Sequence, residues 1–415
     1  MTTSYCLACG HQGLELILDL GEQKPVNNLG ESSAAAPRLP LAMVACPVCG
    51  HGQLSKFVPP AMLFDNYLYA SSTSNSLRLY EQAFAGAIAS IGEGGGSVLE
   101  IASNDGLLLG YLKEQGLSFL GVDPAVRMVD RANALGLHTT LGYWPDVVPE
   151  IGTRRFDFVV GQNVLPHTPN PLAFLAGARA VLADEGVAIF QTSQVDMVAN
   201  GEFDTIYHEH CSFFCETSAR ALGDRAGFRH FGVTYSRIHG NSALFFFSNS
   251  TEALKRALAA LSSKHSDWDE WRAPPGPNPT LRRRRTLSDW RDFGRLARDR
   301  MAVVRSITDE AQKAGRRVIA VGAAAKGITF VRAAGVTVDL LVDEAEDKIG
   351  LVVDGLGISI SGLGDVAYRE DDLFLVTAWN FVHELGAKLR DAGAAGSSSA
   401  CTYFPRLAIE RLDLA

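Results

Sequence analysis

Two cysteine pairs constrain the start of the chain most strongly. Cys6-x-x-Cys9 and Cys46-x-x-Cys49 are separated by residues 10–45, and a glycine follows each pair. Four thiolates on two such turns are the ligand set of a closed tetrahedral zinc site, which keeps no position open for chemistry. The spacing therefore predicts a small N-terminal domain, residues 1–65, that folds around a structural Zn²⁺ held by Cys6, Cys9, Cys46 and Cys49.

The length and composition place the rest of the chain in a broad class. A chain of 415 residues is too long for one ordinary domain. Its seven cysteines, four of them in metal-ligand pairs, indicate the reducing cytoplasm rather than a disulfide framework. No basic and apolar leader and no run of 18 apolar residues is present, so no membrane partner is expected. The net charge of −8 argues against nucleic-acid binding. We expect a cytoplasmic monomer or weak homo-oligomer.

Residues 66–255 alternate between strand and helix patterns. A helical pattern covers 77–91, and short apolar runs at 97–101, 119–123, 156–160 and 187–191 indicate buried strands. This alternation is typical of a parallel, doubly wound sheet, whose ligands bind at the carboxyl ends of the strands. The fold class that we predict is therefore α/β.

The turn after the first of these strands indicates the cofactor. It reads Glu100-Ile101-Ala102-Ser103-Asn104-Asp105-Gly106, without the G-x-G-x-x-G that lets backbone approach a pyrophosphate. Glu100 suits a cationic ligand, and Asp123, at the end of the next strand, suits ribose hydroxyls. Together they favour S-adenosylmethionine over NAD. The candidate cofactor-binding residues are Glu100, Ala102, Ser103, Asn104, Asp105 and Asp123.

The stretch from Phe203 to Phe214 concentrates the side chains of acid–base chemistry. It contains two imidazoles, a phenol and two carboxylates between aromatic residues, which lower the local dielectric constant and strengthen electrostatic contacts. His208 and His210 share a face only in an extended segment, so a metal site is a weaker interpretation. A solvated polar turn is the other alternative.

A second α/β unit is expected over residues 256–415. It follows a proline-rich stretch and the basic run Arg282–Arg285, which is interpreted as a solvated helix start, with contact to an anionic substrate as the alternative. After a strand at 317–321, Gly322 to Lys326 is typical of a strand-to-helix turn that receives phosphate, although it is not a P-loop. Further strands are expected at 338–342 and 373–377.

The ordered set of these pieces resembles the sugar C-methyltransferases that act on nucleotide-linked keto-deoxysugars. The resemblance spans nearly the whole chain. Its pieces are both cysteine pairs, Pro25-Val26-Asn27-Asn28, Glu100–Gly106, Asn163, His167, Tyr207-x-Glu209-His210, His239-Gly240, Gly322-x-x-x-Lys326 and Ala378-Trp379-Asn380. Departures include Ala102, where the family has glycine, and Asn241-Ser242 after His239-Gly240; they leave the acceptor's identity open.

The resemblance implies three domains and a reaction. Residues 1–65 bind zinc, 66–255 form a Rossmann-like methyltransferase domain, and 256–415 form a Rossmann-like α/β domain that completes the acceptor site. The enzyme deprotonates the carbon next to a ketone and methylates it, in deoxysugar, antibiotic or surface-glycan biosynthesis. Asn163 joins the cofactor site, and His239, Asn241, Lys326 and Asn380 bind the substrate.

The implied chemistry needs a base and a group that stabilises an enolate. His210 is the first choice as base and Tyr207 the second, with Glu209 orienting the imidazole as a carboxylate does in a triad. His167 and His239 are candidates to polarise the ketone, or are structural histidines.

Three alternatives stay open at this point. An O- or N-methyltransferase on a similar scaffold needs a weaker base. An NAD-dependent sugar-modifying enzyme is disfavoured by the missing G-x-G-x-x-G. A zinc-organised binding protein without catalysis is disfavoured by the clustered acid–base residues.

Overall fold

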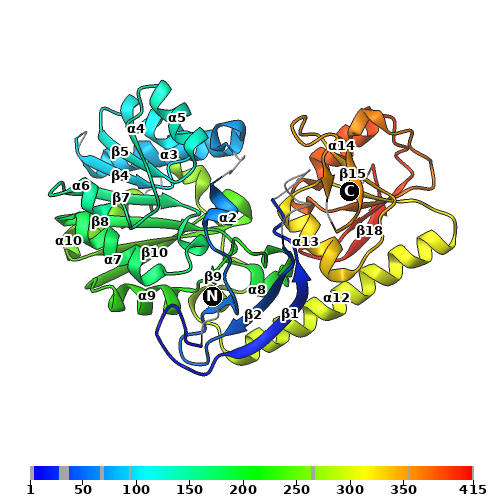
Figure 1. The fold of residues 1–415 in the computed structure, drawn as a ribbon, viewed down its shortest axis with the longest axis horizontal. Helices are drawn as coiled ribbons and strands as arrows, with labels where there is room; N and C mark the ends of the chain where they lie inside the picture. The colour runs from blue at the N-terminus through cyan, green and yellow to red at the C-terminus, as the bar shows by residue number, and fades with distance from the viewer. Residues whose placement is uncertain are drawn as a thin grey trace.

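The computed structural model describes residues 4–27, 37–65, 70–92, 95–262, 267–353 and 355–413. Asn28, part of the expected loop after Pro25, lies outside them. Two α/β lobes stand side by side, and an N-terminal sheet lies between them at the bottom of the view (Figure 1). Within these ranges no helix is both long and apolar enough to cross a membrane.

The first lobe is built on a seven-stranded sheet. Its order is β10-β11-β8-β7-β4-β5-β6, in which β8, β7, β4, β5 and β6 are parallel and β11 and β10 continue antiparallel. The strands are β4 Ser97–Ile101, β5 Ser118–Asp123, β6 Thr139–Leu141, β7 Phe156–Gln162, β8 Leu182–Thr192, β10 His230–Ser236 and β11 Ser242–Ser248. Because β5 and β7 lie on opposite sides of β4, the strand order switches direction between β4 and β7.

Helices and short turns connect these strands. They are α2 Ala61–Phe64, η1 Ser71–Thr73, α3 Asn75–Ile91, α4 Leu107–Glu114, α5 Val126–Ala134, α6 Val148–Ile151, η2 Leu165–His167, α7 Pro171–Val181, α8 Met197–Asn200, η3 Phe203–Thr205, α9 Glu216–Arg225, η4 Ile238–Gly240 and α10 Thr251–Ala260. The Ser74 hydroxyl caps α3 by accepting from the Leu77 N–H at 3.3 Å. Helix α3 buries Leu77, Phe84 and Ile88 at helical spacing.

The second lobe has its own seven-stranded sheet, in the order β14-β15-β13-β12-β16-β17-β18. Its strands are β12 Val318–Val321, β13 Leu340–Asp343, β14 Val352–Val353, β15 Ile358–Gly362, β16 Leu373–Val376, β17 Ser399–Thr402 and β18 Ala408–Arg411. The helices and turns from residue 267 onward are η5 Asp267–Trp271, α11 Pro279–Arg283, α12 Leu287–Lys313, α13 Ala325–Ala334, η6 Leu363–Asp365, η7 Trp379–Phe381 and α14 Val382–Asp391. The α/β class expected from the sequence is confirmed.

The N-terminal sheet includes one strand from a distant part of the chain. Its order is β1-β2-β3-β9, with β1 Glu15–Gln23, β2 Leu39–Ala45, β3 Gly52–Leu54 and β9 Ser212–Phe213. Strand β9 forms the end of the acid–base stretch, shortly after His210, and Ser212 pairs with Gln53. The end of that stretch is therefore fixed to the sheet beside the cysteine pairs.

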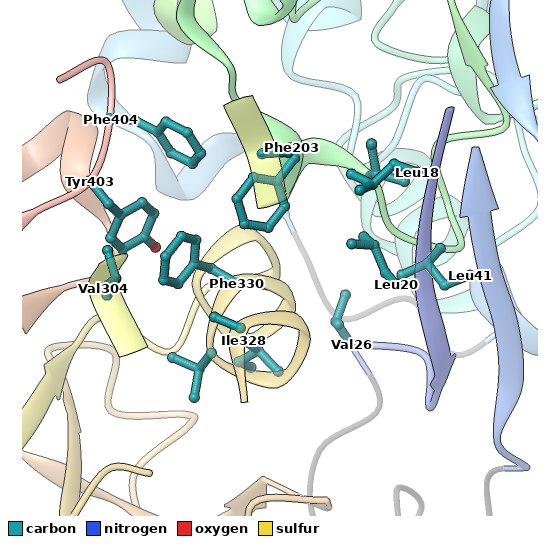
Figure 2. Packing of buried hydrophobic residues seen from close by; sticks show 14 of the residues in the cluster. Leu18, Leu20, Val26, Leu41, Phe203, Val304, Ile328, Phe330, Tyr403 and Phe404 are labelled. Carbon is teal, nitrogen blue, oxygen red and sulfur yellow. The ribbon is translucent and has the colours of Figure 1, made fainter. Parts of the chain in front are cut away.

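One apolar core joins the N-terminal sheet to the second lobe. Figure 2 shows Leu18, Leu20 and Leu41 of β1 and β2 near Phe203, Phe330 and Phe404. The ring centroid of Phe203 lies 5.3 Å from that of Phe330, and that of Phe404 lies 5.7 Å from Phe203. Burial of several aromatic side chains of this size stabilises a junction strongly.

The basic run Arg282–Arg285 is only half solvated, so the expectation of a solvated helix start was wrong for two of its members. Arg282 forms a buried, bidentate ion pair with Asp196, at 2.7 and 2.6 Å. Arg285 is 2% exposed and donates to the backbone carbonyls of Phe213 and Val195. Both guanidiniums tie the chain after η5 to the first lobe, and neither lines the large cavity described below.

The four cysteines of the two pairs come together. Their sulfur atoms all lie within 4.8 Å of one another, and the distances Cys6–Cys49 and Cys9–Cys46 are both 3.6 Å. A tetrahedron with metal–sulfur bonds of about 2.3 Å has sulfur–sulfur edges of about 3.8 Å, so the cluster fits zinc. The two pairs are alike, since Cys6 and Cys46 each donate their N–H to the carbonyl five residues later at 2.8 Å.

Gly50, after the second pair, has a packing reason to be glycine. Its φ is +70°, and a Cβ there would lie 2.0 Å from the carbonyl oxygen of Arg285. The Trp290 indole also donates to the Gly50 carbonyl at 3.0 Å. The second cysteine turn is therefore packed directly against the start of α12.

We expect Cys46→Ser to lower the zinc content from about one ion per chain and to lower the melting temperature, because small metal domains fold around their ion. Elemental analysis and thermal unfolding measure both. Cys401→Ala, which removes a buried thiol of β17 outside the cluster, should keep its zinc. Wild-type protein purified without chelators and found free of zinc would contradict the assignment.

Candidate active site

A cavity of about 940 Å³ lies where the two α/β sheets present their carboxyl ends. It is lined by residues that follow β4, β5 and β7 in the first lobe. In the second lobe it is lined by Ala324, Ala325, Lys326, Thr377, Ala378, Asn380 and Phe381. In the second sheet β12 lies between β13 and β16, so its order switches direction there. Ligands of open α/β sheets bind at such switch points, and here both switch points face one cavity.

The turn after β4 adopts a backbone conformation that glycine favours, although no glycine occupies the two positions concerned. Ala102 and Asn104 have φ values of 59° and 49°. The left-handed region costs an L-residue such as alanine about 1–2 kcal/mol, and asparagine tolerates it better. The loop therefore keeps the shape of a glycine-rich ligand turn without its glycines, and Ala102, Ser103 and Asn104 line the cavity.

Asp123 ends β5 at the same cavity. Its carboxylate accepts from the Asn104 N–H at 2.9 Å and from the Ala125 N–H at 2.8 Å. Burial raises the pKa of this carboxyl, and the two N–H donors oppose that shift. The carboxylate has lone pairs left for hydroxyl groups of a ligand.

Asp105 was expected to bind cofactor, but it does not line the cavity. Its Oδ2 instead accepts from the Ser72 hydroxyl at 2.5 Å. Asn104 accepts from the Ser71 N–H at 2.8 Å. The hydrogen bond to Asp105 thus holds η1 against the turn after β4. The sequence did not indicate this role.

His210 and Tyr207 form a hydrogen-bonded pair in the wall of the cavity. The Nδ1 of His210 lies 2.7 Å from the Thr205 carbonyl oxygen, so this nitrogen carries the hydrogen. Its Nε2 then accepts from the Tyr207 hydroxyl at 2.9 Å. Burial, with smaller effects from His167 and Lys326, holds the pKa of His210 well below its usual range. The imidazole is therefore neutral and ready to accept a proton.

Glu209 does not orient His210, so this part of the triad analogy was wrong. The Nδ1 partner is the Thr205 carbonyl, whereas Glu209 accepts from the Asn27 side chain at 2.6 Å. Burial raises the pKa of Glu209 to about 7. Glu209 does not line the cavity, and it connects the acid–base stretch to the loop after β1.

The remaining expected residues divide between the cavity and its support. His167, His239, Lys326, Asn380 and Asn163 line the cavity. Burial lowers the pKa of His167 to about 4, and its ring centroid lies 4.9 Å from that of His210.

Asn163 and Asn241 hold backbone and side chains in place. Asn163 has a φ of 52°, and its side chain accepts from the Ser193 N–H at 3.1 Å. Asn241 does not line the cavity, because its amide donates to Asp196 at 2.9 Å beside the buried Arg282. Asn241 was expected to bind substrate, and the structure gives its side-chain amide a protein partner instead.

Lys326 lies in the first turn of α13, at the cavity wall of the second lobe. Its Nζ lies 5.3 Å from the centre of the Trp379 ring. The Trp379 indole donates to the buried Asp204 at 2.9 Å, which is the residue before Thr205. Residues that follow β12 and β16 are thus linked to the loop that carries the Tyr207–His210 pair.

Several cavity residues were missed by sequence reasoning. Glu81, Trp144 and Gln194 all line the cavity. The side-chain amide of Gln194 lies 2.7 Å from His210 Nδ1. The sequence could have indicated Glu81, because it is a charged residue on the apolar face of a predicted helix. No sequence pattern indicated Trp144 or Gln194.

Comparisons with known proteins agree with this geometry. Residues 6–64 match the family "Putative zinc binding domain", residues 77–230 match "Methyltransferase domain", and residues 282–405 match "C-methyltransferase C-terminal domain". The C-methyltransferase NovU of Streptomyces niveus is 28% identical over 397 residues, which cover 92% of this chain and 90% of that protein.

Two further matches cover smaller shares of the chain. The ubiquinone biosynthesis O-methyltransferase of Bradyrhizobium diazoefficiens is 33% identical over 102 residues, 24% of this chain and 40% of that protein. The structure of a SAM-dependent methyltransferase from Archaeoglobus fulgidus, 13% identical, has a TM-score of 0.36 and covers 41% of this chain and 94% of that one.

The three family matches follow the order of the zinc cluster, the first lobe and the second lobe. Together with the full-length relative they favour C-methylation over the O- or N-methyltransferase and NAD-dependent alternatives. The chain belongs to the S-adenosylmethionine-dependent C-methyltransferases that carry an N-terminal zinc-binding domain.

Proposed function

We propose that this C-methyltransferase methylates the carbon next to the ketone of a nucleotide-linked keto-deoxysugar. The observation that carries the proposal is one cavity lined by the switch points of two α/β sheets, with the neutral Tyr207–His210 pair between them. One switch point suffices for the methyl donor, so the second is free for a nucleotide. The boundaries that we propose for the three domains remain 1–65, 66–255 and 256–415.

The cavity fits the methyl donor at its first-lobe end. S-adenosylmethionine supplies an electrophilic methyl group when it is bound. Asp123, at the end of β5, would accept from its ribose hydroxyls. Glu81 and Glu100, each with one buried oxygen that lacks a hydrogen-bond partner, would suit its cationic end. Lys326, in the second-lobe wall, is placed for the phosphates of the acceptor.

The Tyr207–His210 pair provides a path for the proton. The phenol oxygen of Tyr207 takes the proton from carbon while its own proton passes to Nε2 of His210, 2.9 Å away. The electron pair of the broken C–H bond moves onto the ketone oxygen, and His167, which lines the cavity, would stabilise the charge there. Because burial disfavours a charged His210, the imidazolium persists only while the substrate carries negative charge.

The proposal predicts that His210→Asn and Tyr207→Phe each lower kcat by about 10²–10⁴, the usual contribution of a general base. The double variant should lose little more than the worse single variant, because residues that act as a unit are non-additive. Turnover and deuterium exchange at the carbon next to the ketone measure this. The exposed His138→Asn is the control. Independent, multiplying losses would show that the two residues do not act as a relay.

The pH dependence of kcat should reflect the lowered pKa of His210. A base with a lowered pKa stays neutral at a pH where an ordinary histidine is already charged. As the pH falls through about 6.5, the ordinary histidine pKa, kcat should therefore stay constant. Activity should decline only at lower pH, where the imidazole charges. A kcat profile with its acid limb at or above about pH 6.5 would contradict a buried neutral imidazole.

Asp123→Ala should weaken the binding of S-adenosylhomocysteine by about 10- to 150-fold, the effect of losing hydrogen bonds to a charged group. Part of this loss is indirect, because the carboxylate also accepts hydrogen bonds from the Asn104 and Ala125 N–H groups and so fixes the ligand-binding turn. Titration calorimetry measures the affinity, and the exposed Asp130→Ala of α5 is the control. Equal affinity in both variants would refute the placement of the donor.

Lys326→Met should raise the KM for the nucleotide-linked acceptor by about 10- to 100-fold, because a charge-assisted contact to phosphate is lost. Affinity for S-adenosylhomocysteine should stay within about twofold. The exposed Lys113→Met of α4 is the matched control. A panel of nucleotide-linked keto-deoxysugars that gives no methylated product with the wild type would refute the acceptor class itself.

A further inference from the structure

Two buried carboxylates from different elements line the part of the cavity that we assign to the methyl donor. Glu81 lies on α3 and Glu100 on β4, and both line the cavity while being only 4% exposed. The position of Glu81 is well defined, because the neighbouring Tyr80 donates its hydroxyl to Gln162 at 3.1 Å. Helix α3 is thereby fixed against the carboxyl end of β7.

Neither carboxylate has a cation to balance it among the residues that the structure describes. One oxygen of each, Oε2, is buried without a hydrogen-bond partner. The charged groups that affect Glu100 are all acidic, namely Glu81, Asp123 and Asp105. Burial raises the pKa of Glu81 to about 8 and that of Glu100 well above its usual range.

A buried acid without a partner is costly, and a pair is costlier still. Folding alone gives no reason for Glu81, since an apolar residue at this position of α3 would pack without that cost. A cationic ligand that enters the cavity would compensate both acids at once. The pair is therefore better explained as a receptor for a positive group than as part of the core.

We propose that Glu81, together with Glu100, binds the α-ammonium group of the methyl donor. An ammonium group offers three N–H donors, which match two carboxylates, whereas a sulfonium offers none. The sulfonium must also present its methyl group to the acceptor carbon that the Tyr207–His210 pair deprotonates, and this pair comes from the loop after β8 rather than from α3 and β4. The inference rests on the S-adenosylmethionine dependence of the family and adds a residue of α3 to its donor site.

The test compares two ligands that differ in the amino-acid portion. S-adenosylhomocysteine carries the ammonium group and no sulfonium, whereas 5′-methylthioadenosine lacks the amino-acid portion. Glu81→Gln should weaken the first by about 10- to 100-fold and leave the second within about twofold in titration calorimetry. The exposed Glu114→Gln of α4 should bind both ligands like wild type.

Each other outcome has a defined meaning. Equal weakening of both ligands would show that Glu81 only supports the shape of the cavity and would overturn the proposal, as would unchanged affinity for both. A loss for S-adenosylmethionine without a loss for S-adenosylhomocysteine would place Glu81 at the sulfonium and overturn the assignment to the ammonium. Wild type that binds neither ligand would refute the donor site itself.

Proton release gives a second measurement that a purely structural role would not change. With a pKa of about 8 in the empty site, Glu81 is largely protonated near neutral pH, and it must ionise to pair with an ammonium group. Binding of S-adenosylhomocysteine should therefore release protons, and affinity should rise between about pH 6 and pH 8. Glu81→Gln should release fewer protons in buffers of different ionisation enthalpy. Equal release in both proteins would contradict the proposal.

Discussion

The placement of the acid–base loop depends on the pairing of β9 with β3. Ser212 and Phe213 pair with Gln53 and Gly52, so the chain directly after His210 belongs to the sheet beside the cysteine cluster. At the other end of the loop, Phe203 packs against Phe330 of the second lobe. The zinc cluster is thus a structural support for the site, although no cysteine of the cluster approaches the cavity.

The same loop is the point where the two lobes are coupled. The Thr205 carbonyl sets the tautomer of His210, and the preceding residue, Asp204, is held by Trp379 at the carboxyl end of β16. Lys326 lies over the Trp379 ring. Lys326 therefore belongs to the same group of side chains that positions His210, the proton acceptor that we propose. This contact links the second lobe to the proposed site.

The electrostatics of the cavity change along its length. Glu81 and Glu100, each with one buried oxygen that lacks a hydrogen-bond partner, line the cavity from the first lobe, and Lys326 lines it from the second. The neutral imidazoles of His167 and His210 line the same cavity. This distribution suits a cationic methyl donor, and it agrees with the enolate and the anionic acceptor that we propose. The neutral imidazoles are the most important of these groups for proton transfer. Burial lowers the pKa of His210 and of His167, so both rings are uncharged and can accept or share a proton.

The sequence by itself determined the local features. Cysteine spacing predicted the metal cluster, and apolar runs with terminal acids predicted the strands and the residues at their ends, because both depend on neighbours in the chain. The tertiary structure alone decided which side chains meet. It paired His210 with Thr205 and Tyr207, placed Glu209 on Asn27, buried Arg282 against Asp196 and brought Glu81 beside Glu100. These partners are far apart in sequence or depend on backbone direction within a loop, and no periodic pattern encodes such contacts.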